Sequence, residues 1–218
     1  MRRPQNLKCC TCLLNSGNMI PGYFPIFTDV FSQWFSLIER YNQQRPDDVP
    51  WWYNERASLS FFAGAVWNSG GIALEEYSTG KSHKKESWPG RGDLYIKIKE
   101  EEYVIEAKQV WTSMSSRAQK TKEKVEAALL RARRDAGKTN SWGARRLGLV
   151  FVIPYIKRCK ESEFKVCVND WLTHIKSVEK ASQAWILFEK LETRFRYKTY
   201  FYPGVAVILR ALKSLGKP

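Results

Sequence analysis

The chain has 218 residues, a formal net charge of +14 and 44% hydrophobic residues, including nine tryptophans, which fits one domain with an aromatic core. It has no run of about 18 apolar residues, and Met1-Arg2-Arg3 is not followed by an apolar signal region, so we expect a cytoplasmic protein that does not enter a membrane. The positive charge favours a polyanionic partner, most often nucleic acid.

Five cysteines are present, and three of them, Cys9, Cys10 and Cys12, lie close together near the first residue. They do not form a paired CxxC framework, and the chain has only two histidines. A structural zinc site is therefore poorly supplied with ligands, and reduced thiols are the expected state.

Residues 1–26 contain Gly17, Pro21, Gly22 and Pro25 with little periodicity, which predicts an irregular N-terminal extension. Two helices are expected next, over residues 28–43 and 50–67, because apolar residues recur at three- and four-residue steps.

Glu55 falls on the apolar stripe of the second expected helix, between Trp52 and Leu59. A carboxylate that faces a core is costly unless it is paired or binds a metal. The alternative is a half-exposed glutamate that the helix dipole favours near the N-terminus.

A strand is expected over residues 72–79, where Glu75 and Glu76 point to opposite faces, so only one of them can reach a site on the sheet. We keep Glu76 as a reserve ligand. Residues 80–92 predict a basic loop that either holds a phosphate backbone or is simply solvated. Its cations are Lys81, Lys84, Lys85 and Arg91.

A β-hairpin is predicted in the middle of the chain, where the apolar residues of GRGDLYIKIKEEEYVIEAKQV alternate with polar ones around an acidic tip. A turn centred on residues 100–101 places Asp93 opposite Lys108 and Tyr95 opposite Glu106. Because the side-chain period of a strand is two, Glu106 and Lys108 share one face. Two carboxylates and a lysine are therefore expected within reach of one another.

This set of side chains suits a metal-dependent phosphodiesterase. Mg²⁺ prefers oxygen ligands, usually one or two carboxylates together with water and phosphate oxygens. A neighbouring lysine can orient the attacking water or stabilise the charged transition state. The alternative is a surface hairpin with a solvated polar face.

Asp93, a gap of twelve residues and then Glu106-Ala107-Lys108 resemble the PD-(D/E)xK motif of the restriction endonuclease-like nuclease superfamily. The resemblance covers residues of about 50 to 156, and Gly92 stands where that motif usually has proline. It implies an α-β-β-β-α-β core and Mg²⁺-dependent cleavage of DNA, less often RNA, with Mn²⁺ able to substitute. It also implies that Asp93, Glu106 and the carbonyl of Ala107 bind the metal.

The same resemblance implies that Glu55 helps to bind the metal and that Lys108 acts on the water. Many members have a glutamate on the helix before the sheet, and Glu55 is placed as that residue would be. Gln109, directly after the motif lysine, is an auxiliary candidate. The exonuclease-like branches have a QxxxY pattern on the following helix, whereas here Gln119 is followed by Glu123.

A long helix is expected over residues 113–136, with cations at helical spacing on one face. Such a stripe fits a track for phosphates, although charged faces are usually just solvated. The residues proposed for the track are Arg117, Lys120, Lys124, Arg131 and Arg134.

The rest of the chain predicts a buried central strand over 146–156, a helix over 168–181 and short strands over 184–188 and 205–209. The aromatic and basic stretch 194–204 either stacks on bases or packs as an edge strand. The fold class expected is α/β, with a mixed β-sheet flanked by α-helices. The single domain, 27–218, adds an N-terminal helix and C-terminal strands to the restriction endonuclease-like core.

Three functions are compatible with these features. The leading hypothesis is a Mg²⁺-dependent DNA endonuclease of bacterial or phage defence, restriction or DNA processing, acting as a homodimer or with a partner protein. The second is a catalytically inactive or partner-dependent nucleic-acid-binding subunit with the same fold. The third, an RNA-binding protein with a coincidental acidic triplet, explains the charge but not the positions of Glu55 and Asp93.

Overall fold

The computed structural model describes residues 13–20, 24–83, 86–115, 120–157, 161–188, 196–197 and 199–212. One mixed, mostly antiparallel sheet runs in the strand order β1-β6-β9-β5-β4-β3-β2, and β8 with β7 joins it at the end of β5. The strands are β1 (Leu13–Met19), β2 (Ile72–His83), β3 (Glu86–Ile98), β4 (Glu101–Ser113), β5 (Arg145–Lys157), β6 (Ser182–Phe188), β7 (Arg196–Tyr197), β8 (Tyr200–Phe201) and β9 (Gly204–Ala211).

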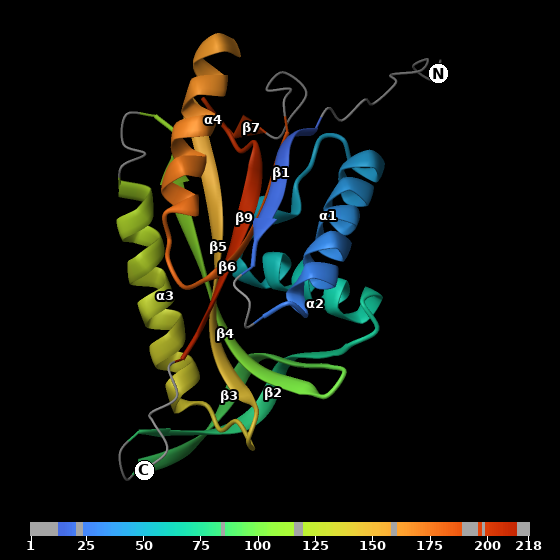
Figure 1. The fold of residues 1–218 in the computed structure, drawn as a ribbon, viewed down its shortest axis with the longest axis vertical. Coiled ribbons are helices and arrows are strands. Elements are labelled where there is room, and N and C mark those ends of the chain that lie inside the picture. Colours follow the sequence, from blue (N-terminus) through green and yellow to red (C-terminus); the bar gives the residue numbers. More distant parts are fainter. Residues whose placement is uncertain are drawn as a thin grey trace.

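Helices cover both faces of this sheet. Helices α1 (Phe27–Gln44) and α2 (Glu55–Asn68) lie on one side, while α3 (Lys120–Lys138) and α4 (Glu161–Lys176) lie on the other (Figure 1). The predicted α/β class with a mixed, helix-flanked sheet is therefore confirmed. None of the described helices is long and apolar enough to cross a membrane.

Alternation along the central strands builds two hydrophobic cores. Leu149 and Phe151 of β5 face the core under α1 and α2, while Val150 and Val152 face the core under α3 and α4. Because both faces are covered, β5 is buried without interruption from Leu147 to Pro154. The prediction of a central, fully buried strand is confirmed.

Most predicted helices and strands are present with shifted ends. The helix expected over 50–67 is divided into a short 3₁₀ turn (Pro50–Trp52) and α2, because Asn54 caps α2 by accepting a hydrogen bond from the Ala57 N–H at 2.9 Å. The helix expected over 113–136 begins seven residues later, since β4 continues to Ser113 and α3 starts at Lys120. The helix expected over 168–181 runs earlier, as α4.

Two predictions of irregular structure are wrong. Residues 80–92 do not form a loop, because β2 and β3 extend as a two-stranded ribbon as far as the His83–Glu86 pair. Residues 1–26 are not irregular throughout, because β1 pairs antiparallel with β6 at the edge of the sheet. There, Asn15 Oδ1 accepts a hydrogen bond from Trp185 Nε1 at 2.8 Å, which fixes β1 to the core by a side chain.

The predicted register of the central hairpin is also wrong, by two residues. Tyr95 lies opposite Val104 and Lys97 opposite Glu102, so the turn is one residue earlier than expected. A shift of two residues keeps every side chain on its face, so Asp93 and Glu106 still share one side of the sheet.

Candidate active site

The candidate site lies where β3 leaves β4. The two strands pair only from Leu94–Ile105 to the tip of the hairpin; beyond that point β3 pairs with β2 alone, and β4 continues beside β5 in parallel. At the divergence the Ala107 N–H donates a hydrogen bond to Asp93 Oδ2 at 2.7 Å. The side chain of Asp93 thus bridges the two strands where their backbones separate.

Glu106 is the most buried acid of the site, with 2% of its surface exposed. Its Oε1 accepts hydrogen bonds from Thr139 Oγ1 at 2.6 Å and from Lys81 Nζ at 3.0 Å. Burial raises the pKa of Glu106, the charge of Asp93 raises it further, and the bonds from Thr139 and Lys81 oppose that rise. Hydrogen bonds hold the Glu106 carboxylate in one position, although burial and the charge of Asp93 disfavour its ionised form.

Lys108 lies next to both expected metal-binding positions on β4. Its Nζ donates a hydrogen bond to the carbonyl oxygen of Ala107 at 2.7 Å and lies 3.5 Å from Asp135 Oδ2 on α3. The ammonium group is therefore held at the Ala107 carbonyl, with Asp135 as its counter-charge.

Glu55 joins this group from α2. Burial raises the pKa of Glu55, the charge of Lys108 lowers it, the charge of Asp93 raises it, and the backbone N–H of Gln109 stabilises the carboxylate by a hydrogen bond. Each interpretation of Glu55 from the sequence describes part of this environment. Glu55 is the first residue of α2, where the helix dipole favours a carboxylate, and it also lies beside the candidate site. The side chain of Gln109 accepts a hydrogen bond from Ser58 Oγ at 2.9 Å, which ties α2 to β4.

The donor chemistry fits a hard divalent cation, because Asp93, Glu106 and Glu55 are carboxylates, and the charge of Asp93 raises the pKa of both Glu55 and Glu106. As the described side chains stand, however, no three histidine, cysteine or acidic residues are close enough to hold one ion. Two ammonium groups lie on oxygens that a cation would take, Lys81 on Glu106 and Lys108 on Ala107.

The predicted nucleic-acid-binding residues lie in several environments. Lys81 is paired with Glu106, and Lys124 Nζ donates to the Trp111 carbonyl at 3.3 Å. Arg91 is exposed, as are three cations of the α3 face, Lys120, Arg131 and Arg134. Lys84, Lys85 and Arg117 lie outside the described residues.

The reserve ligand Glu76 is turned away from the carboxylates. Its backbone has a φ of 50°, in the left-handed region, and its side chain pairs with Arg56 at 3.1 Å and with Arg91 at 3.9 Å. The structure therefore places Glu76 in a surface ion-pair group and not with Asp93 and Glu106.

Two residues of the site were missed by the sequence reasoning. Thr139 reaches Glu106 because an isolated β-bridge joins it to Lys81, a contact with no local sequence signal. The hydroxyl of Tyr77 is buried, and no described residue hydrogen-bonds to it. Burial raises the pKa of Tyr77, and so do the charges of Glu106 and Asp93, which places the phenol near both acids.

A groove of about 500 Å³ opens beside the site, between the end of α3 and the end of β2. It is lined by Ser82, His83, Arg134, Gly137 and Lys138. Two of the five lining residues are permanent cations, so the groove suits an anionic group such as phosphate.

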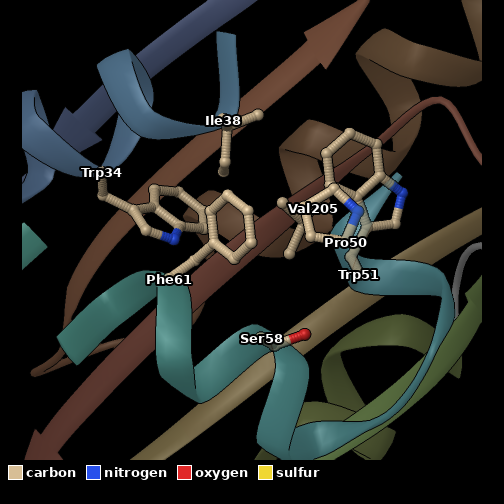
Figure 2. Close-up of a pocket in the computed structure, with 7 residues that line it drawn as sticks. All are labelled: Trp34, Ile38, Pro50, Trp51, Ser58, Phe61 and Val205. Carbon is tan, nitrogen blue, oxygen red and sulfur yellow. The ribbon is translucent and has the colours of Figure 1, made fainter. Parts of the chain in front are cut away.

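A second cavity is a packing void in the core. It has about 10 Å³ of space, enough for one water at most. Figure 2 shows its lining: Trp34 and Ile38 from α1, Ser58 and Phe61 from α2, and Pro50, Trp51 and Val205. The single hydroxyl, that of Ser58, is already bonded to Gln109, so this void is not a ligand site.

Comparisons with known proteins returned no relative. No family model matches the chain, and neither a curated protein nor a solved structure matches it. The functional proposal therefore depends on the residues of this chain alone.

Proposed function

We propose that this protein is a Mg²⁺-dependent nuclease that hydrolyses phosphodiester bonds in DNA. The observation that carries the proposal is the meeting of Asp93, Glu106 and Lys108 where β3 and β4 diverge, with Glu55 joining them from α2. The element order α2-β2-β3-β4-α3-β5, with β4 and β5 parallel, supports it, because that order is what the motif resemblance implies.

Asp93, Glu106, Glu55 and the Ala107 carbonyl would hold the metal. When bound, Mg²⁺ or Mn²⁺ lowers the pKa of a coordinated water and offsets charge at the phosphate. Lys108 would then position the attacking water or donate to a phosphate oxygen. Thr139 would keep the Glu106 carboxylate in place through its 2.6 Å hydrogen bond.

The exposed cations of α3 and the groove at its end would bind the phosphate backbone. Binding through several lysine and arginine contacts weakens steeply as salt rises. Cutting both strands of a duplex takes two such sites, so an endonuclease of this kind would act as a homodimer or with a partner protein.

One observation favours a second candidate, a nucleic-acid-binding subunit without turnover. In the described conformation Glu106 is neutralised by Lys81 at 3.0 Å, so a charged partner for this buried acid is already supplied by the chain itself. Such a protein would bind DNA but would not respond to divalent metal.

Cleavage of supercoiled plasmid and of single-stranded DNA with Mg²⁺, Mn²⁺ or EDTA tests the proposal. The variants are Asp93→Asn and Lys108→Ala, with Lys97→Ala as the matched control, because Lys97 lies on the same hairpin but pairs with Glu102. Metal-dependent cleavage that both site variants lose and the control keeps is expected. Undiminished cleavage by Asp93→Asn would exclude this site, whereas DNA binding without any cleavage would support the second candidate.

A further inference from the structure

An exposed tryptophan stands on a short, well-fixed loop between α3 and β5. Trp142 has 62% of its surface exposed, and its φ of 46° lies in the left-handed region, where non-glycine residues are uncommon. The conformation is held by Asn140 Oδ1, which accepts from the Trp142 N–H at 3.2 Å, and by the Ala144 N–H, which donates to the Ser141 carbonyl at 2.7 Å. These bonds hold the backbone of Trp142 in a conformation that leaves its large apolar side chain exposed to solvent.

The Trp142 indole belongs to an aromatic group with Tyr77 and Tyr95. The ring centroids of Trp142 and Tyr77 are 6.2 Å apart with an interplanar angle of 49°, and those of Tyr77 and Tyr95 are also 6.2 Å apart. The Tyr77 ring lies across Gly92, where a Cβ would come within 2.4 Å of it. The Tyr77 ring can therefore occupy this position, between the indole and the acids, only because residue 92 has no side chain.

This group lies in line with the acids and the basic groove. The segment that follows α3 runs antiparallel to β2, since Thr139 bridges Lys81 and the Asn140 N–H donates to the Gly80 carbonyl at 2.8 Å. The groove lies beside residues 82–83 at one end of this pairing, and Tyr77 lies at the other. Between them, Lys81 and Thr139 both bond to Glu106.

We propose that Trp142, supported by Tyr77, stacks on an unpaired nucleobase while the groove holds a phosphate of the same strand. The inference rests on the proposed function and deepens it, because it makes single-stranded or locally unpaired nucleic acid the substrate class. Every base has a face that can stack on an aromatic ring, but in a duplex both faces are already covered by neighbouring bases. A fixed, exposed indole beside acids that act on phosphodiesters therefore selects unpaired strands.

The test is binding of a short fluorescent oligonucleotide, measured by anisotropy in EDTA, as a single DNA strand, as a single RNA strand and as a DNA duplex. Trp142→Ala should weaken single-strand binding about 5- to 150-fold, the range for loss of one base–aromatic stack, and change duplex binding less than about twofold. Trp142→Phe should retain most of the affinity. Trp67→Ala is the matched control, because Trp67 is 53% exposed but lies near the end of α2, about 18 Å along the helix from Glu55.

A strand with abasic positions provides a second measurement, whose wild-type arm does not depend on how the variant folds. The wild-type protein should bind this strand more weakly than the intact one, because the indole then has no base to stack on. Trp142→Ala should bind both strands alike, because it has no indole to stack on either of them. We call Trp142 with Tyr77 the stacking platform. Equal losses of affinity by Trp142→Ala for single strand and duplex, or no loss for either, would overturn this platform. The RNA arm decides whether the platform also accepts ribose.

Failure of this inference and failure of the proposed nuclease are separable. Binding in EDTA reports the platform without cleavage, whereas the Asp93→Asn comparison reports cleavage without Trp142. If cleavage depends on Asp93 but Trp142→Ala leaves single-strand binding unchanged, the platform is refuted and the nuclease is not. If Trp142→Ala loses single-strand binding selectively but the wild-type protein never cuts DNA, the platform is supported and the nuclease is refuted.

Discussion

The central and outer strands of the sheet differ in how much of their surface is buried. Strands β5, β6 and β9 are covered on both sides, and most of their residues are buried. In β2, by contrast, nearly all positions are exposed or half-buried, and in β3 buried positions alternate with half-buried ones only from Gly92 to Ile98. The apolar core therefore lies mainly in one half of the sheet, and the candidate chemistry lies in the other.

The outer half of the sheet, which consists of β2, β3 and β4, carries features that cost stability. Glu106 is buried with a raised pKa, and Glu76 has a left-handed backbone within a strand. Features of this kind persist when the surrounding structure over-determines them, and they gather at functional sites. The comparison predicts that changes in the central half reduce the free energy of unfolding, and that changes in the outer half act mainly on binding and cleavage.

The largest expected effect is that of Phe151→Ala in β5. Phe151 is fully buried, so its truncation should lower the free energy of unfolding by about 3–5 kcal/mol. Denaturant titration followed by circular dichroism measures this loss. A loss below about 1 kcal/mol would mean that the central strands are not where stability is concentrated.

The next effect is that of Gly92→Ala, which tests the packing between Tyr77 and the strand of Asp93. The new methyl group would meet the Tyr77 ring at 2.4 Å, so we expect a loss of about 1–3 kcal/mol in unfolding free energy and a loss of cleavage. Adding Tyr77→Ala should restore part of the stability, because the clashing ring is then gone. Simply additive losses in the double variant would show that the two residues do not interact.

A smaller effect on stability is expected from Thr139→Val, which removes one donor to Glu106 and keeps the shape of the side chain. Lys81 still bonds to the carboxylate, so the loss in unfolding free energy should be about 1 kcal/mol. The loss of cleavage should be the larger signal, since Glu106 is then held by Lys81 alone. Thr139→Ser keeps the hydroxyl and should keep wild-type cleavage, although the loss of a buried methyl group lowers its stability; if cleavage is lost, the hydrogen bond is not the cause.

The sequence predicted the central half better than the outer half, for a physical reason. The continuous apolar run over 146–156 leaves one choice, a strand covered on both sides, and β5 is that strand. The ribbon over 80–92 was missed because Gly80, Pro89 and Gly90 are typical of turns, although Pro89 and Gly90 pair there with β2. A two-stranded ribbon buries little apolar surface, so hydrophobic periodicity does not mark it.

The sequence predicted those residues of the candidate site whose positions follow from the alternation of side chains along strands. Asp93, Glu106 and Lys108 share one face because side chains alternate along strands, and this is unaffected by the two-residue error in register. Thr139 comes to Glu106 through a bridge between distant segments, and Tyr77 directly follows Glu76, whose backbone is left-handed. Neither contact has a local pattern, so sequence reasoning cannot supply them.

The smallest expected effect is the pH dependence of Glu55→Gln. The folded-state pKa of Glu55 is raised by burial, so the folded protein holds this proton more tightly than the unfolded chain does. The resulting stability is fully present below the unfolded pKa and is lost as pH rises through the folded value. Wild-type protein therefore loses stability on going from acidic to neutral pH through this group, and the glutamine variant does not.

At neutral pH Glu55→Gln should be the more stable protein, by less than about 1 kcal/mol because Glu55 is only partly buried and solvent screens its charge. Thermal midpoints measured from pH 4.5 to pH 8 should converge at the acidic end. Glu123→Gln, on the exposed side of α3, controls for the loss of one negative charge. Mg²⁺ should reverse the order at neutral pH, because a ligand that binds the folded state stabilises the protein that retains its carboxylate. If Mg²⁺ shifts the two midpoints equally, Glu55 does not contribute to metal binding, and the outer half of the sheet holds the ion with Asp93 and Glu106 alone.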